Sequence, residues 1–190
     1  MHIQSICKSA SQKTNALLRI RPYLNTNCAK MLSSVFIMSQ FKYCPLIWIF
    51  SSKGNNGLVN KIHKRALRAV YQDFESPFEV LLEKGDEVTI HVQNLRTLMF
   101  EVFKSLNRLN PEIMWDMFEF KLTPYNLRSG YSLKLPKANS SKFGINSVIF
   151  RGCVTWNSLP SAVKSVNSIS AFKRIIKTWD GKCCTCFICQ

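Results

Sequence analysis

The stretch "TIHVQNLRTLMFEVFKSLN", residues 89–107, decides the fold of this chain. Its large apolar side chains recur at the three- to four-residue spacing of one face of an α-helix. They are Leu95, Leu98, Met99, Val102, Phe103 and Leu106. The pattern predicts a helix whose apolar stripe is buried in a core.

Outward from this helix, the same periodicity and the positions of the prolines predict further helices and a mainly α fold. Helices are expected over residues 5–20, over 26–50 with a kink near Pro45, over 58–71, from Pro111 with the proline at the first helical position, and over 168–179 with Ser168 or Ser170 as N-cap.

The pattern changes after residue 120, where prolines and glycines interrupt short apolar stretches. We expect a helical domain over residues 1–120, a loop-rich mixed segment over 121–182 that ends in an amphipathic helix, and a cysteine-rich tail over 183–190.

The chain is strongly basic. It carries 26 lysines and arginines against 11 aspartates and glutamates, which gives a net charge of +15. Such an excess favours a polyanionic partner. Nucleic acid is favoured over an anionic membrane surface, and a basic soluble domain without such a partner stays open.

One predicted helix carries a basic stripe. In residues 58–71, an apolar set (Leu58, Ile62, Ala66, Val70) alternates with Lys61, Lys64, Arg65 and Arg68 on another face. The cations could contact phosphates without selecting a base sequence, or form an ordinary solvated face.

A second basic set lies in the loop-rich segment and has aromatic residues between its cations. It consists of Arg128, Lys134, Lys137, Lys142 and Arg151, with Tyr125, Tyr131 and Phe143. Cations beside aromatic rings suit stacking on unpaired bases. Anchoring of the loops is the alternative.

The N-terminus favours an intracellular protein in the cytoplasm or nucleus. "MHIQSICKSASQK", residues 1–13, has no apolar core of a secretory signal peptide. Residues 31–50 are long enough to span a bilayer, but Lys42, Gln40 and Pro45 disfavour that role, so no membrane partner is expected.

No catalytic site is predicted. The four aspartates, Asp73, Asp86, Asp116 and Asp180, are too dispersed for a two-metal site, and the Asp86–Glu87 pair is expected in a solvated turn. His63 and His91 are expected to be surface or cap residues. Nucleophile-elbow, Walker and zinc-protease motifs do not occur.

The tail "KCCTCFICQ", residues 182–190, concentrates four thiols: Cys183, Cys184, Cys186 and Cys189. Four thiolates this close in sequence cannot easily surround one zinc ion, and no histidine lies nearby in the sequence. Disulfides are disfavoured in a reducing compartment, and the run lacks the fourth member of an iron–sulfur motif.

Five blocks in fixed order resemble the C-terminal region of jockey-like, LINE-type non-LTR retrotransposon reverse transcriptases. They are "SQFKYCPLIWIF" (39–50), the long block 60–119 that begins "NKIHKRALRAVY", "YNLRSG" (125–130), "VIFRGCVTWNSLP" (148–160) and "SISAFKRIIKTW" (168–179). The likeness covers nearly the whole chain. One departure is Cys153, where the family commonly has proline after the glycine.

The resemblance implies that residues 1–120 correspond to the thumb and following helices, which hold the template–primer duplex after the polymerase palm. The family's catalytic aspartates lie in a palm motif that this sequence lacks, so no catalytic residue carries over. The family also ends in a Cys-x-Cys-x-x-Cys cluster, which Cys184, Cys186 and Cys189 match. No cofactor is required, but zinc at the tail cysteines stays open if a distant ligand completes the site.

Two hypotheses follow. The first is a non-catalytic fragment of a truncated or relic element copy, which binds RNA or an RNA–DNA duplex through phosphate contacts. The second is an interaction domain that packs against the palm of a longer parent protein, with an apolar patch around residues 41–50 and no binding activity of its own.

Overall fold

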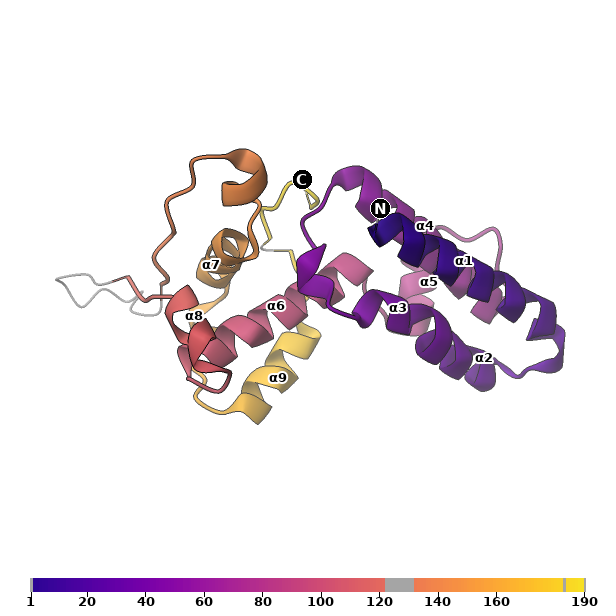
Figure 1. The fold of residues 1–190 in the computed structure, drawn as a ribbon. Helices are drawn as coiled ribbons and strands as arrows, with labels where there is room; N and C mark the ends of the chain where they lie inside the picture. The colour runs from indigo at the N-terminus through magenta and orange to yellow at the C-terminus, as the bar shows by residue number, and fades with distance from the viewer. Residues whose placement is uncertain (1, 122–131, 183, 190) are drawn as a thin grey trace. The chain divides into compact units, whose positions relative to one another are not determined.

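The computed structural model describes residues 2–121, 132–182 and 184–189, and most of them lie in helices (Figure 1). Among these residues, β-structure is confined to a single antiparallel bridge between Phe120 and Leu133. The predicted mainly α fold is therefore confirmed.

The chain divides into two compact units, Met1–Asn94 and Leu95–Gln190. The division falls inside α6 (Ile90–Leu106), between Asn94 and Leu95. The domain limits expected near residues 120 and 182 were placed where the sequence pattern changes, whereas this division follows the compactness of the fold. Those limits stay predictions.

The first unit is built from helical segments that run back and forth along one another. They are α1 (His2–Ile20), η1 (Arg21–Tyr23), α2 (Thr26–Leu32), the π-helix η2 (Ser33–Met38), α3 (Ser39–Lys42), η3 (Pro45–Ile47), α4 (Lys53–Tyr71) and α5 (Phe78–Gly85).

The core of the first unit forms where α1, α4 and the α2–η2 segment pack together. Small residues at the contact, such as Ala10 and Ala66, are completely buried and let the helices approach closely. Larger side chains, among them Leu17, Phe41 and Val70, fill the space between them. This packing presents one outer face of α1 and α4 to solvent.

The helix expected over residues 26–50 forms over residues 26–42, but its expected continuation past a kink at Pro45 is wrong. The helical path instead ends at Lys42, and Cys44 adopts a left-handed conformation with φ of 43°. The residue before a proline is disfavoured in the α-region, and Pro45 has no N–H to continue the helix. Pro45 instead begins the short helix η3.

The buried face of α4 also differs from the predicted one. Ala66 and Val70 are buried as expected, but Leu58 is 40% exposed, and Val59 and His63 take the inner positions. The helix α5 was not predicted, because its eight residues are too few to show a periodic pattern.

The second unit is organised around α6. The remaining helical segments are η4 (Glu112–Met117), the π-helix η5 (Ser141–Ile145), α7 (Val148–Ser158), α8 (Ser161–Lys164) and α9 (Ile169–Thr178). The rings of Phe103 and Phe172 stack with centroids 4.2 Å apart, and Trp156 lies 5.9 Å from Phe172. This aromatic stack joins α6, α7 and α9.

Helix α6 confirms the prediction from residues 89–107, since five of its six stripe residues are almost completely buried: Leu95, Leu98, Met99, Val102 and Phe103. Helix α9 is also confirmed, with Ser168 at its N-cap position. Pro111 precedes a 3-10 helix rather than starting an α-helix, and α7 was not predicted.

Candidate metal centre and basic surface

A tight turn at residues 180–182 lies between α9 and the cysteine-rich tail. The Lys182 N–H donates a 3.0 Å hydrogen bond to Oδ1 of Asp180, and Gly181 adopts a φ of 77°, which glycine tolerates best. The Cys184 N–H then donates to the Gly181 carbonyl at 2.9 Å. Arg151 of α7 supports the following residues, because its Nη1 donates to the Thr185 carbonyl at 3.4 Å.

Three tail cysteines and one histidine gather at a single point. The ligand atoms of His91, Cys184, Cys186 and Cys189 all lie within 4.8 Å of one another. His91 stands in the first turn of α6. His91, Cys184 and Cys186 are buried and Cys189 is exposed, so this cluster could hold a metal ion near the C-terminus.

The spacing suits a small tetrahedral site. Zinc–sulfur bonds of about 2.3 Å place the sulfurs of a tetrahedron about 3.8 Å apart. The Sγ atoms of Cys186 and Cys189 are joined by a 3.5 Å hydrogen bond, and the whole set lies within 4.8 Å. Only small movements would bring the four atoms to bonding distance from a common centre.

The Cys184 and Cys189 thiols favour their protonated forms in the absence of a cation. Hydrogen bonding to the Cys184 and Cys186 sulfurs, together with burial, raises the pKa of the Cys189 thiol far above its usual range. Hydrogen bonding to Cys186, with burial, also raises the pKa of Cys184. A bound cation would reverse this balance, because it stabilises thiolates and releases their protons.

The sequence located part of this cluster. Cys184, Cys186 and Cys189 come together as the tail pattern indicated, while Cys183 lies outside the described residues. The expectation that His91 is a surface or cap residue is wrong, since its side chain is buried beside the thiols. Nothing in the local sequence links His91 to a motif more than ninety residues away.

His63 also departs from expectation. His63 is completely buried rather than on the surface, and its Nε2 lies 3.0 Å from Oε2 of Glu87. The pair Asp86–Glu87 lies in an exposed turn after α5, as expected, and Glu87 makes this one contact from it. The contact fixes the segment before α6 to α4.

The predicted basic stripe of α4 divides into two kinds of residue. Lys61 is exposed and Lys64 is half-buried. Arg65 donates from Nη1 to Oγ of Ser11 at 3.1 Å and from Nη2 to Oδ1 of Asn15, and Arg68 donates to the Ser76 carbonyl at 3.5 Å. The two arginines therefore also hold neighbouring segments in place.

These contacts show that α1 and α4 run parallel. Arg65 lies beside the middle of α1, and Arg21, just after α1, donates from Nε to the Val70 carbonyl at the end of α4. From the same offset between the two helices, we infer that Lys61 lies near the turn of α1 that carries Lys8. We define the α1–α4 seam as the polar residues along this line: Lys8, Ser11, Asn15, Arg19, Lys61 and Arg65.

The seam belongs to a segment without acidic residues. Eleven lysines and arginines, and no aspartate or glutamate, precede Asp73. Within the described part of the chain, none of the eleven forms an ion pair with a carboxylate. Positive charge in this part of the first unit is therefore not neutralised locally.

The second basic set is more dispersed. Lys134 pairs with Glu119 at 3.2 Å, Lys137 is exposed, and Arg151 supports the tail. Tyr125, Arg128 and Tyr131 lie outside the described residues, as do the side chains of Lys142 and Phe143.

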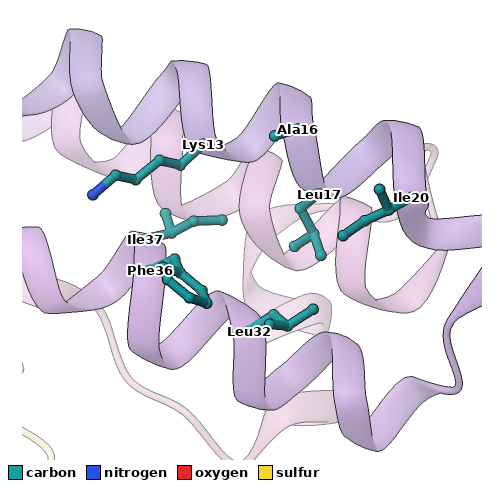
Figure 2. Close-up of a pocket in the computed structure, with 7 residues that line it drawn as sticks. All are labelled: Lys13, Ala16, Leu17, Ile20, Leu32, Phe36 and Ile37. Carbon is teal, nitrogen blue, oxygen red and sulfur yellow. The ribbon is translucent and has the colours of Figure 1, made fainter.

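An apolar pocket of about 220 Å³ opens between α1 and the α2–η2 segment (Figure 2). Leu17, Leu32, Phe36 and Ile37 line it, and the amino group of Lys13 extends away from it. Beside it, Met31, Val35 and Phe36 are each more than half exposed. In the patch expected around residues 41–50, Phe41, Trp48, Ile49 and Phe50 are buried, whereas Tyr43 and Ile47 are 72% and 79% exposed.

Two further observations bear on function. Among the described residues, none of the helices has the length and apolar character needed to cross a membrane. Comparisons with protein-family models, curated proteins and solved structures find nothing that matches this chain.

Proposed function

We propose that this chain is a non-catalytic nucleic-acid-binding part of a non-LTR retrotransposon reverse transcriptase. The ordered sequence blocks that resemble this family support the origin, and the acid-free basic segment around the α1–α4 seam carries the binding proposal. The seam contacts the phosphates of RNA or of an RNA–DNA duplex. Because phosphate contacts carry no base information, binding is largely independent of sequence.

Salt dependence of binding tests this proposal. Four seam cations, Lys8, Arg19, Lys61 and Arg65, predict a log–log slope of affinity against salt of about −3 to −4. The variant Lys8→Gln/Lys61→Gln should reduce that slope by about 1.8, since each phosphate contact contributes about 0.9. These two lysines have no described hydrogen-bond or ion-pair partner, so the change should leave the fold intact.

A matched control is Lys30→Gln/Lys42→Gln, which removes the same charge from exposed lysines of α2 and α3. The binding isotherms are measured on the full chain by fluorescence anisotropy with an RNA–DNA duplex. Equal losses in the seam and control variants would exclude the seam. No binding by the wild-type chain would remove the nucleic-acid proposal altogether.

We further propose zinc as the metal of the cluster of His91, Cys184, Cys186 and Cys189. Three thiolates and one imidazole are a common ligand set for structural zinc. Zinc would tie the tail to α6, without a catalytic role. The purified chain should then contain equimolar zinc by elemental analysis.

Loss of the metal in Cys186→Ser/Cys189→Ser, and retention in Cys28→Ser/Cys44→Ser, would support this assignment, because the control removes free thiols outside the cluster. Zinc content that is unchanged in the first variant would contradict it.

The alternative function is an interaction domain that packs on the palm of a longer protein. The pocket between α1 and η2, with the exposed Met31, Val35 and Phe36 beside it, favours this alternative. It predicts that a separately purified palm binds the chain, and that Phe36→Asp abolishes the complex. Duplex binding that is lost in the seam variant but unaffected by Phe36→Asp would favour the first function.

A further inference from the structure

A second basic hollow lies in the second unit, between α6 and α9. It has a volume of about 230 Å³ and is lined by Arg96, Thr97, Phe100, Lys173, Ile176 and Lys177. We name it the α6–α9 groove. Three of its six lining residues are cationic and none is acidic.

The two helices that form the groove are held firmly together. Phe103 and Phe172 stack in the core beneath them, with centroids 4.2 Å apart. Nε of Arg96 donates a 2.7 Å hydrogen bond to the Trp179 carbonyl, just past the end of α9. This bond orients the Arg96 guanidinium, so at least one cation of the groove is fixed before any ligand arrives.

The groove combines an apolar floor with a cationic rim. Phe100 and Ile176 supply apolar surface, while Lys173 and Lys177 stand one turn apart on α9. The Lys104 ammonium lies 5.3 Å from the Phe100 ring centroid and is paired with Glu101 at 2.7 Å. An aromatic ring bordered by cations suits a ligand with a flat ring and a nearby negative charge.

We propose that the α6–α9 groove binds one nucleotide of a single-stranded nucleic acid, with its base against Phe100 and its phosphates at Lys173 and Lys177. The volume is below the roughly 300–1,000 Å³ of pockets for drug-sized ligands, which matches a single ring system. A base within a duplex is stacked and paired, so its face is not available to Phe100.

This inference rests on the proposed nucleic-acid binding, but it uses residues separate from the seam. The seam would hold the duplex backbone and the groove would hold an unpaired nucleotide. Base–aromatic stacking tolerates any base, so the groove should discriminate single from double strands rather than between sequences.

The test compares two labelled ligands on the full chain, a 12-nucleotide single strand and the matching RNA–DNA duplex. The variant Lys173→Gln/Lys177→Gln should bind the single strand about tenfold more weakly, with the salt slope reduced by about 1.4. Phe100→Leu keeps an apolar side chain but removes the ring, and should weaken single-strand binding about five- to tenfold. Both variants should bind the duplex within about twofold of wild type.

The matched control is Lys121→Gln/Arg174→Gln, which removes two exposed cations of the same unit that do not line the groove. Equal losses of single-strand affinity in the groove and control variants would overturn the groove. The same conclusion follows if the groove variants lose duplex and single-strand binding alike.

These outcomes separate the two proposals. Suppose that duplex binding falls in the Lys8/Lys61 variant but single-strand binding is unchanged in the groove variants. That result would overturn the proposal for the groove and keep the proposed function. A wild-type chain that binds neither ligand would overturn both. Circular dichroism of each variant confirms that the helices remain folded.

Discussion

Nε2 of His63 lies 3.0 Å from Oε2 of Glu87, although His63 is completely buried and Glu87 remains 37% exposed. The His63 ring also meets Phe78 edge-on, with centroids 5.3 Å apart. One imidazole thus contacts α5 and the segment that precedes α6 from its position on α4. In a chain with few carboxylates, this one is used in a structural contact.

Replacing His63 should therefore destabilise the first unit much more than replacing Glu87. His63→Ala removes a fully buried ring and should lower the free energy of unfolding by about 2–4 kcal/mol. Glu87→Gln keeps an acceptor at the surface and should cost about 1 kcal/mol or less. Urea denaturation followed by circular dichroism measures both. Equal losses in the two variants would show that the His63–Glu87 contact, rather than ring packing, dominates.

The cysteines should differ sharply in reactivity. Burial raises the pKa of the Cys153 thiol to about 11 and also raises that of Cys7. Since only the thiolate reacts, about one Cys153 in a thousand is reactive at pH 8. Cys44 is exposed and should be alkylated first.

Brief iodoacetamide treatment at pH 8, followed by peptide mass spectrometry, tests this order. All eight cysteines should react in denaturant, which shows that protection comes from the fold. In Cys44→Ser the fast phase at this site should disappear while Cys153 stays protected. Early modification of Cys153 in the folded chain would contradict its burial.

The helices with a regular apolar stripe were predictable from sequence, whereas α5 and α7 were not. Helix α6 has six apolar residues at helical spacing, so its face was evident. Helix α7 contains Gly152 where a stripe residue would stand, and it packs against partners distant in sequence, such as Phe118 and Val102. Periodicity detects a helix only where apolar residues recur without a break at helical spacing, and the sequence of α7 lacks such an unbroken row.

The candidate site shows the same limit. The close spacing of the tail cysteines marks them as candidate ligands in the sequence. His91 is distant in sequence and comes close to them only in the folded chain. Likewise, the α4 stripe was evident, while the contribution of α1 through Lys8 and Arg19 required the parallel packing of the two helices. Local pattern identifies candidate groups, and tertiary contacts decide which of them meet.

Gly152 should resist substitution by alanine although it lies within a helix. A Cβ at this position would lie 3.0 Å from Phe118 and 3.3 Å from Val102. Alanine should gain about 1 kcal/mol of helix propensity, but crowding against the buried Phe118 ring should cost about 1–3 kcal/mol. Gly152→Ala should therefore be net destabilising.

Gly57 of α4 provides the matched control. A Cβ there would meet nothing within 4 Å, so Gly57→Ala should stabilise the chain by up to about 1 kcal/mol. Thermal unfolding tests whether Gly57→Ala raises the melting temperature while Gly152→Ala lowers it. A higher melting temperature in Gly152→Ala would show that α7 and Phe118 can separate without loss.

Arg21 should act as a structural cation rather than as part of the basic surface. Its side chain is only 7% exposed, and its three nitrogens donate to the carbonyls of Val70 and Leu24 and to Oγ1 of Thr26, at 3.0, 2.5 and 3.2 Å. The guanidinium thus joins the ends of α1 and α4 to the start of α2. Its charge also lies at the C-terminal end of α4, where a cation is favoured.

Arg21→Met should lower the free energy of unfolding by about 3 kcal/mol, because it leaves buried carbonyl groups without donors. Arg21→Lys should recover only part of this loss, since an ammonium cannot reproduce the forked geometry of three separate nitrogens.

Arg19→Met is the matched control, because Arg19 is exposed on the α1–α4 seam. The free energy of unfolding of this variant should change by less than about 0.5 kcal/mol. In chemical denaturation, the free energy of unfolding should fall for Arg21→Met and stay nearly unchanged for Arg19→Met. Duplex affinity at low salt should fall for Arg19→Met. If both variants lost stability equally, the network around Arg21 would not be what holds these three helix ends together.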